Sequence, residues 1–202
     1  MSVITSSNIA SAMSYEAYLA LSEQLFDQGK TTGPKQSESL THYTGLNLRR
    51  MKRLHKTLKL TSETLEAVQA IQEPQYWVIL TEAWCGDAAQ ILPILRAVAQ
   101  ANPLIELKVL LRDENVEIID AYLTDGARSI PKVVMLRKSD LKELGVWGPR
   151  PAQAQELLYA HKAQEGRPYA ELAKDLQLWY NKDKALSTQA ELVDVLRSKI
   201  AA

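Results

Sequence analysis

The chain has 202 residues, of which 46% are hydrophobic, and its 24 basic and 24 acidic side chains give a formal net charge of zero. This composition favours one globular domain with a sizeable core and an extension. It argues against a nucleic-acid or membrane-surface ligand unless the charges are segregated. The single cysteine, Cys85, excludes an internal disulfide and a cysteine-based metal cluster. We see no secretory signal and no membrane-spanning run, and we therefore expect a soluble, cytoplasmic protein.

Helices are expected along the first 73 residues. Residues 1–13 look like a frayed tail. Ser14 is a candidate N-cap for an amphipathic helix that ends near Gly29. A second helix is predicted over 40–58, and a third, capped at 61 or 62, ends before Pro74.

The only charge run of the chain, residues 49–56, lies on the second of these helices. One interpretation is a solvated face whose cations lie favourably near a helix C-terminus. The other is a site for an anion, a nucleic acid or a protein partner. The sequence leaves both open and favours the solvated face.

Alternating strands and helices follow. Apolar runs at 78–80, 105–111, 133–136 and 144–147 predict four strands. Helices are predicted after the first strand, after Asp113 as a cap, and after Pro151 and Pro168. Thr188 and Glu191 have the spacing of a capping box for a last helix.

This order predicts an α/β fold, a three-layer α/β/α sandwich with a central mixed sheet. The first two strands, joined by a helical crossover, should be parallel. The last two strands, joined by a short turn, should form an antiparallel hairpin. The N-terminal helices would form an extension packed on this core.

Three features carry a resemblance to the thioredoxin superfamily. Trp84-Cys85-Gly86 is similar to the active-site opening of that family, Pro93 to its helix-kinking proline, and Ile130-Pro131 to its cis-proline. More narrowly, the turn with Asp87 and Ala88 resembles a bacterial thioredoxin-like subgroup with a helical N-terminal extension. The resemblance implies a thioredoxin-like domain over 74–202, an extension over 1–73, and a substrate groove at Ile130 and Pro131.

Two departures from the family pattern bear on function. Ala88 stands where thioredoxins have their resolving cysteine, and Ile79 stands where they have a buried aspartate. The dithiol route of thioredoxin is therefore not expected. A single thiol can still form a mixed disulfide, which an external thiol must then resolve.

Cys85 is the predicted catalytic residue. Its place at a helix start favours the thiolate, while Asp87 opposes it, so we expect a modestly lowered pKa. The favoured function is a monothiol thiol-disulfide oxidoreductase without a bound cofactor, with glutathione as a co-substrate. The alternative is a redox-inactive module that binds a polypeptide or protein partner beside Trp84 and Pro131. No oligomeric state is indicated.

Glu82 and Arg128 are weaker candidates for a functional role. Glu82 can act as a base, but a solvated carboxylate at a strand end is favoured. Arg128 can hold a glutathione carboxylate, but an exposed arginine is favoured. Trp77 and Trp179 are expected in the core. No metal site is predicted, because the three histidines lack ligand spacing with one another and with Cys85.

Overall fold

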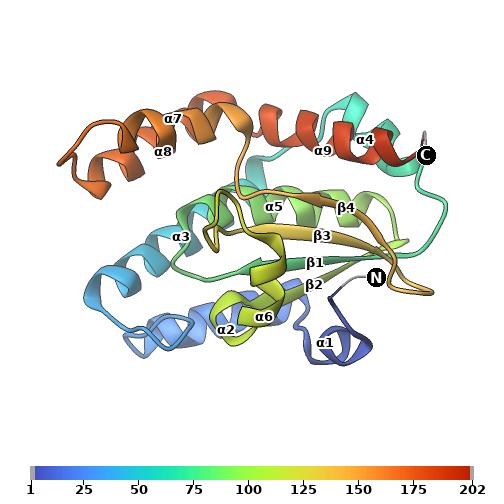
Figure 1. Ribbon diagram of the computed structural model, residues 1–202, viewed down its shortest axis with the longest axis horizontal. Coiled ribbons are helices and arrows are strands. Elements are labelled where there is room, and N and C mark those ends of the chain that lie inside the picture. Colours follow the sequence, from blue (N-terminus) through green and yellow to red (C-terminus); the bar gives the residue numbers. More distant parts are fainter. Residues whose placement is uncertain (1–2, 201–202) are drawn as a thin grey trace.

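The computed structural model describes residues 3–200, with side chains over 3–198. A four-stranded mixed sheet forms the centre of the molecule, with strand order β2-β1-β3-β4 (Figure 1). The strands are β1 (Gln75–Thr81), β2 (Ile105–Leu111), β3 (Lys132–Arg137) and β4 (Glu143–Trp147). β1 pairs with β2 in parallel, whereas the β1–β3 and β3–β4 pairs are antiparallel. The expected mixed sheet is confirmed.

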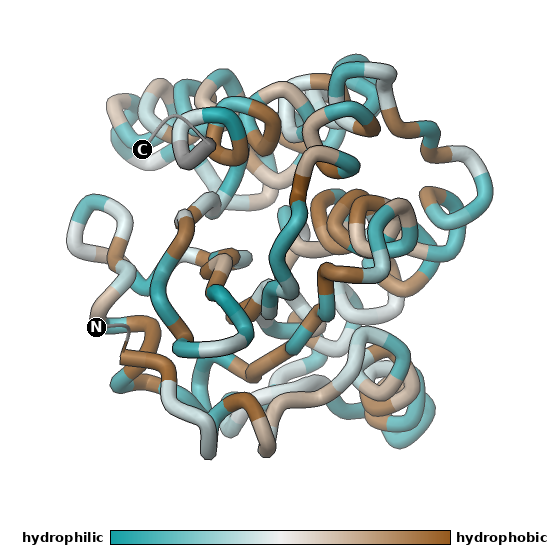
Figure 2. Tube along the Cα trace, turned by 90° about the vertical axis from the view of Figure 1, so that its right-hand side faces the viewer, coloured by the Kyte–Doolittle hydropathy of each residue, from teal (hydrophilic) through white to brown (hydrophobic). Residues whose placement is uncertain are grey.

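β1 is the central strand of the core. Its residues Trp77 to Leu80 are fully buried, as expected for a continuous apolar run with helices on both faces. In Figure 1, α5 (Gly86–Ala101) and α9 (Leu186–Ile200) lie on one side of the sheet, and α2 (Tyr15–Asp27) and α6 (Val116–Ile119) lie on the other. Hydrophobic segments gather toward the middle of the molecule in Figure 2, while many outer turns are hydrophilic. The three-layer arrangement therefore agrees with the sequence prediction.

The N-terminal helices pack on this core. Ser14 caps α2 as expected, and Thr61 caps α4 (Ser62–Gln69). Between them, α3 (Glu38–Thr57) packs against α5. Gly45 of α3 touches Phe26 so closely that a β-carbon at Gly45 would overlap the ring, which fixes the crossing of α2 and α3. This packing holds α3 beside the start of α5.

The expected frayed tail is wrong for the part of it that the structure describes. Residues Ser6–Ser11 form α1, which begins with a capping box between Thr5 and Asn8. Ile4 and Ile9 are buried, and Met13 forms an isolated antiparallel bridge with Val109 of β2. The two apolar side chains were too widely spaced to show a helical period in the sequence.

Two other local predictions are wrong. The helix expected after Asp113 is broken into η1 (Arg112–Glu114), the short α6 and η2 (Asp120–Tyr122), and Asp113 is not its cap. The last helix begins at Leu186, so Thr188 lies buried inside it. Glu191 does not cap that helix; it accepts hydrogen bonds from Trp147 and from the backbone of Ala152.

A helical hairpin precedes α9. It consists of α7 (Ala152–Lys162) and α8 (Tyr169–Asp183) and extends from the sheet layers in Figure 1. Its apolar cluster, separate from the main core, contains Ala154, Leu172, Leu176 and Tyr180, with Trp179 partly buried against it. None of the described helices is long and apolar enough to cross a membrane.

The sheet register positions the site. Leu80, near the end of β1, pairs with Lys132, the first residue of β3. Because these strands are antiparallel, the segment that leaves β1 and the segment that enters β3 meet at one edge of the sheet. The first carries Cys85, and the second carries Pro131.

Candidate functional site

Cys85 lies at the junction of the β1–α5 connection and α5. It is the N-cap residue of α5 and makes no side-chain capping bond. Its side chain is 7% exposed, and its Sγ donates a hydrogen bond to the carbonyl oxygen of Ile130 at 3.3 Å. The peptide bond between Ile130 and Pro131 is cis. The structure thus brings together the cysteine and the proline loop, two features 45 residues apart in the sequence.

A second prolyl turn supports this loop. The Gly148–Pro149 bond is also cis, and Gly148 has φ of 112°, in the region that favours glycine. A β-carbon at Gly148 would overlap the carbonyl group of Pro131. Lys132, buried next to it, donates hydrogen bonds to the carbonyl of Gly148 and to Thr124. The turn after β4 and the proline loop are therefore fixed to each other.

The expectation of a lowered pKa for Cys85 is wrong. Burial raises the pKa of the Cys85 thiol to about 12, and the negative charge of Asp87 adds to the increase. The backbone N–H groups of Ala88 and Asp87 and the charge of Arg150 act in the opposite direction. The helix start does favour the thiolate, as predicted, but the loss of hydration outweighs it. In this structure the neutral thiol is the stable form at neutral pH.

Asp87 is anchored by two residues that the sequence did not indicate. Arg150 forms a buried ion pair with it, and the hydroxyl of Tyr180 donates a hydrogen bond to its other oxygen at 2.7 Å. Burial, followed by the charge of Asp87, raises the pKa of Tyr180 well above its usual value. These contacts fix the segment after β4 and helix α8 to the first turn of α5. Asp87 was expected to oppose the Cys85 thiolate, but its contacts with Arg150 and Tyr180 were not predicted.

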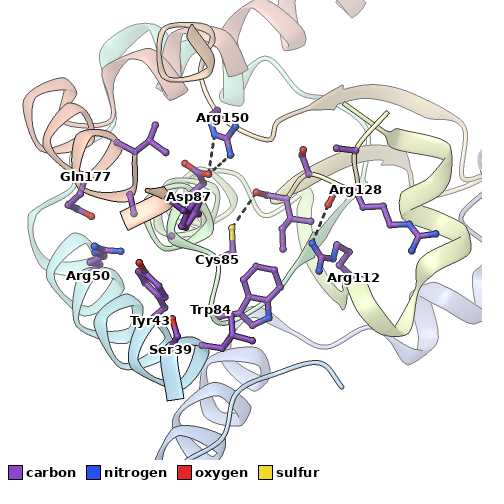
Figure 3. A pocket seen from close by; sticks show the side chains of 18 of the residues that line it. Ser39, Tyr43, Arg50, Trp84, Cys85, Asp87, Arg112, Arg128, Arg150 and Gln177 are labelled. Atoms are coloured by element: carbon purple, nitrogen blue, oxygen red, sulfur yellow. Dashed lines mark hydrogen bonds and ion pairs between the residues drawn. The ribbon is translucent and has the colours of Figure 1, made fainter. Parts of the chain in front are cut away.

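A pocket of about 640 Å³ opens above Cys85 (Figure 3). Its wall is formed by α3, the turn 84–87, the segments around Arg112 and Ile130, and one face of α8. In Figure 3, Tyr43 and Arg50 lie on one side of Cys85 and Trp84 lies on the other. The predicted turn residues Trp84, Gly86 and Asp87 line the pocket with Ile130. Ala88 is buried in α5, and Pro131 is buried and does not line the pocket. The lining residues of α8, among them Tyr169 and Gln177, were not predicted.

Four arginines line this pocket, and three of them have acidic partners. Arg112 pairs with Asp113 at 2.7 Å and lies over the ring of Trp84, 4.9 Å from its centroid. Arg128 is exposed, as expected, and pairs with Asp120 at 2.6 Å. Arg150 pairs with Asp87.

The fourth, Arg50, has no ion pair within the described part of the chain. Its Nη1 donates a hydrogen bond to Oδ1 of Asn47 at 2.9 Å. Its place shows that the basic run 49–56 is divided between two environments: Arg49 is exposed, whereas Arg50 faces the pocket.

Glu82 differs from the expected solvated carboxylate. It is fully buried at the end of β1, and its Oε1 accepts a hydrogen bond from the backbone N–H of Asp113 at 2.9 Å. Burial raises the pKa of this carboxyl group. Glu82 thus fastens the end of β1 to the start of η1. The loop between α2 and α3 also packs here: Thr31 and Thr32 are buried, and Thr32 accepts a hydrogen bond from the backbone N–H of the next residue, Ala83. The sequence could not show this burial, because that loop lies 51 residues away in the chain.

The arrangement of the strands, α5 and the cis-prolyl loop defines a thioredoxin fold with one cysteine at the turn between β1 and α5. The chain belongs to the thioredoxin family, whose match covers residues 33–172. That range runs from the loop before α3 into α8, so it includes most of the pocket wall.

Two solved structures show the same fold. One is a protein of unknown function from Pseudomonas aeruginosa, PA1234, with 19% identity and a TM-score of 0.64 over 100% of this chain and 99% of that one. The other is an HIV epitope-scaffold, with 21% identity and a TM-score of 0.53 over 92% of this chain and 99% of that one. No curated protein matches the chain.

Proposed function

We propose that the chain is a monothiol thiol-disulfide oxidoreductase that forms mixed disulfides through Cys85. One observation carries the proposal: the Cys85 Sγ lies 3.3 Å from the Ile130 carbonyl, at the wall of a pocket. The thiolate of Cys85 attacks one sulfur of a bound disulfide, whose S–S bond breaks as the new bond forms. The departing thiolate takes up a proton. An external thiol then attacks the mixed disulfide and restores Cys85, and a new disulfide leaves.

The size of the pocket favours a small co-substrate. A volume of about 640 Å³ is within the range of about 300–1,000 Å³ typical of small-molecule sites. Helices α3 and α8 flank the opening, which favours a low-molecular-weight thiol such as glutathione over an extended polypeptide. We propose a cytoplasmic setting, where glutathione is available to resolve the mixed disulfide.

The raised pKa of Cys85 determines the expected rate at which it forms a mixed disulfide. With a pKa of about 12, about one molecule in 10⁵ carries the thiolate at pH 7. A more basic thiolate is a better nucleophile, which offsets part of this loss. Together these effects make Cys85 roughly a hundredfold slower than a free cysteine at neutral pH. The reaction should accelerate about tenfold for each pH unit.

The hydrogen bond from Cys85 to the carbonyl of Ile130 also favours a second candidate, a redox-inactive module that binds its partner without covalent chemistry. A thiol that is buried and hydrogen-bonded to a carbonyl is protected from oxidation. In this case Cys85 would serve as a small polar contact in the pocket wall. A low-molecular-weight ligand or the end of a polypeptide would be the partner.

Intact mass after incubation with oxidised glutathione tests the two candidates. A monothiol oxidoreductase gains one glutathione, faster at pH 9 than at pH 7, and loses it again when reduced glutathione is added. Cys85→Ser should gain none. If the wild-type mass stays unchanged at pH 9 over many hours, the oxidoreductase is excluded and the binding module remains.

A further inference from the structure

Arg50 has a fixed position in the wall of the pocket. Its Nη1 donates to Asn47 Oδ1 at 2.9 Å, and Asn47 Nδ2 in turn donates to the carbonyl of Ala83 at 2.9 Å. Asn47 is fully buried. These two bonds connect α3 with the segment between β1 and Cys85. The guanidinium is therefore held relative to the cysteine by a buried side chain.

The position of the guanidinium is next to the active-site turn. Arg50 Nη1 lies 3.7 Å from the place that a β-carbon on Gly86 would occupy. Gly86 follows Cys85 directly, so a molecule that contacts the Cys85 sulfur is within reach of Arg50. A side chain at position 86 would occupy part of that space.

Arg50 forms no ion pair among residues 3–198, in contrast to Arg112, Arg128 and Arg150. The negative charge of Asp87 acts on Arg50, but this carboxylate is already paired with Arg150. Arg50 is partly buried, and burial lowers its pKa, but a guanidinium stays protonated in proteins. A cation partly removed from water without an ion pair of its own is unfavourable. An anion bound in the pocket would provide the ion-pair partner that Arg50 lacks among the described residues.

We infer that Arg50 binds a carboxylate of the small molecule whose sulfur reaches Cys85. The ligand class is thus a low-molecular-weight thiol or disulfide that carries a carboxylate group. This inference rests on the proposed function. Nη1 is engaged by Asn47, which leaves Nη2 and Nε to bind carboxylate oxygens. Leu40, Leu176 and Tyr43 provide the apolar part of the wall for the carbon chain of the ligand.

The neighbouring cations of the run do not share this role. Arg49 is exposed, and Arg53 donates a hydrogen bond to Asn181 on α8 at 3.1 Å. Only Arg50 of the run lines the pocket. Arg49 therefore offers a matched control, one residue away on the same helix.

The test compares dithiodipropionate with its uncharged diamide, which has the same carbon chain. The rate of mixed-disulfide formation is measured by intact mass at pH 9 for both reagents. The wild-type chain should prefer the dicarboxylate. Arg50→Gln should lower that preference about ten- to a hundredfold, the range for a hydrogen bond to a charged group. Because the preference is a ratio, a change in the reactivity of Cys85 itself cancels.

Two further variants complete the test. Arg49→Gln should keep the preference, and Arg50→Lys should keep part of it, since a lysine retains the charge without the planar geometry. A preference that is equal in the wild type and in Arg50→Gln overturns the inference, even if Cys85 reacts with both reagents and the proposed function stands.

A binding experiment without covalent chemistry distinguishes a failure of the carboxylate site from a failure of the proposed oxidoreductase function. S-methylglutathione cannot form a disulfide, and its binding is measured by calorimetry with the wild type and Arg50→Gln. If Cys85 reacts with neither reagent but S-methylglutathione binds with an Arg50-dependent affinity, the carboxylate site stands and the oxidoreductase fails. If binding is absent or independent of Arg50, the carboxylate site is overturned.

Discussion

Arg150 and Asp87 form an ion pair in which two guanidinium nitrogens donate to one carboxylate oxygen, at 2.7 and 3.1 Å. Their side chains are 11% and 9% exposed, so the pair is largely removed from water. Tyr180 donates to the other oxygen of Asp87. Together with Tyr180 the pair connects three segments, and Asp87 lies two residues from Cys85. It therefore acts on both the stability of the site and the ionisation of the thiol.

Asp87→Asn should lower the pKa of Cys85 below about 12, because the variant removes the negative charge that disfavours the thiolate. It should also reduce the free energy of unfolding by about 3–5 kcal/mol, since it leaves Arg150 buried without its counter-charge. Alkylation rates against pH measure the first effect, and urea unfolding measures the second. Asp120→Asn is the control, because it breaks the exposed pair with Arg128 and should change both quantities less.

Arg150→Gln should move the Cys85 pKa in the opposite direction. The positive charge of Arg150 favours the thiolate, so its loss leaves Asp87 unopposed and raises the pKa further. This variant should also destabilise the chain, as the asparagine variant does. A mere loosening of the site would increase alkylation in both variants. Faster alkylation at pH 9 in Arg150→Gln than in the wild type would therefore contradict the electrostatic interpretation.

Ala88→Cys should create a dithiol that can form an internal disulfide. Ala88 lies on the first turn of α5, one turn from Cys85, and is 2% exposed. We expect no catalytic disulfide reduction by the wild type when thioredoxin reductase is the only electron source, and slow turnover by the variant. The turnover should be slow because Ile79, fully buried, provides no proton acceptor. Insulin reduction coupled to NADPH consumption measures both. Rapid turnover by the wild type would show that Cys85 needs no internal partner.

The sequence predicted the features that depend on local patterns. The strand over 105–111 was predicted with the observed bounds, because a long apolar run between turn residues is typical of a strand. Cys85 and Pro131 were expected together because the family motif carries that information. Their meeting follows from the antiparallel pairing of β1 and β3.

The long-range contacts of Asp87 could not be predicted from any local pattern in the sequence. Arg150 and Tyr180 are 63 and 93 residues from Asp87, and nothing in their immediate sequence indicates a common partner. The prediction of a lowered pKa for Cys85 was wrong for a related reason. The helix start is a local feature that the sequence shows, whereas the burial that outweighs it depends on a loop far along the chain.

Ile9→Ala should destabilise the chain, although residues 1–13 looked like a tail. Ile9 is 7% exposed and is the buried residue of α1, so its truncation should lower the free energy of unfolding by about 2–4 kcal/mol. Ser11→Ala, on the exposed side of the same helix, is the control and should have little effect. Urea unfolding measures both variants. Equal stability of the two would mean that α1 contributes nothing to the core.

The stability of the chain should fall as the pH rises above about 8.5, the ordinary pKa of a free cysteine. In the folded chain the pKa of Cys85 is about 12, so between these values the unfolded chain loses its thiol proton and the folded chain keeps it. The unfolded state then binds fewer protons, and the free energy of unfolding decreases with pH by up to about 1.4 kcal/mol per unit. Cys85→Ser lacks this group and should show a shallower decrease. Urea unfolding at pH 8, 9 and 10 measures the difference. Higher pH values are avoided because the pKa values of Tyr15, Tyr18 and Tyr180 are also raised by burial. Parallel pH profiles for the wild type and Cys85→Ser would mean that the folded thiol titrates like a free one.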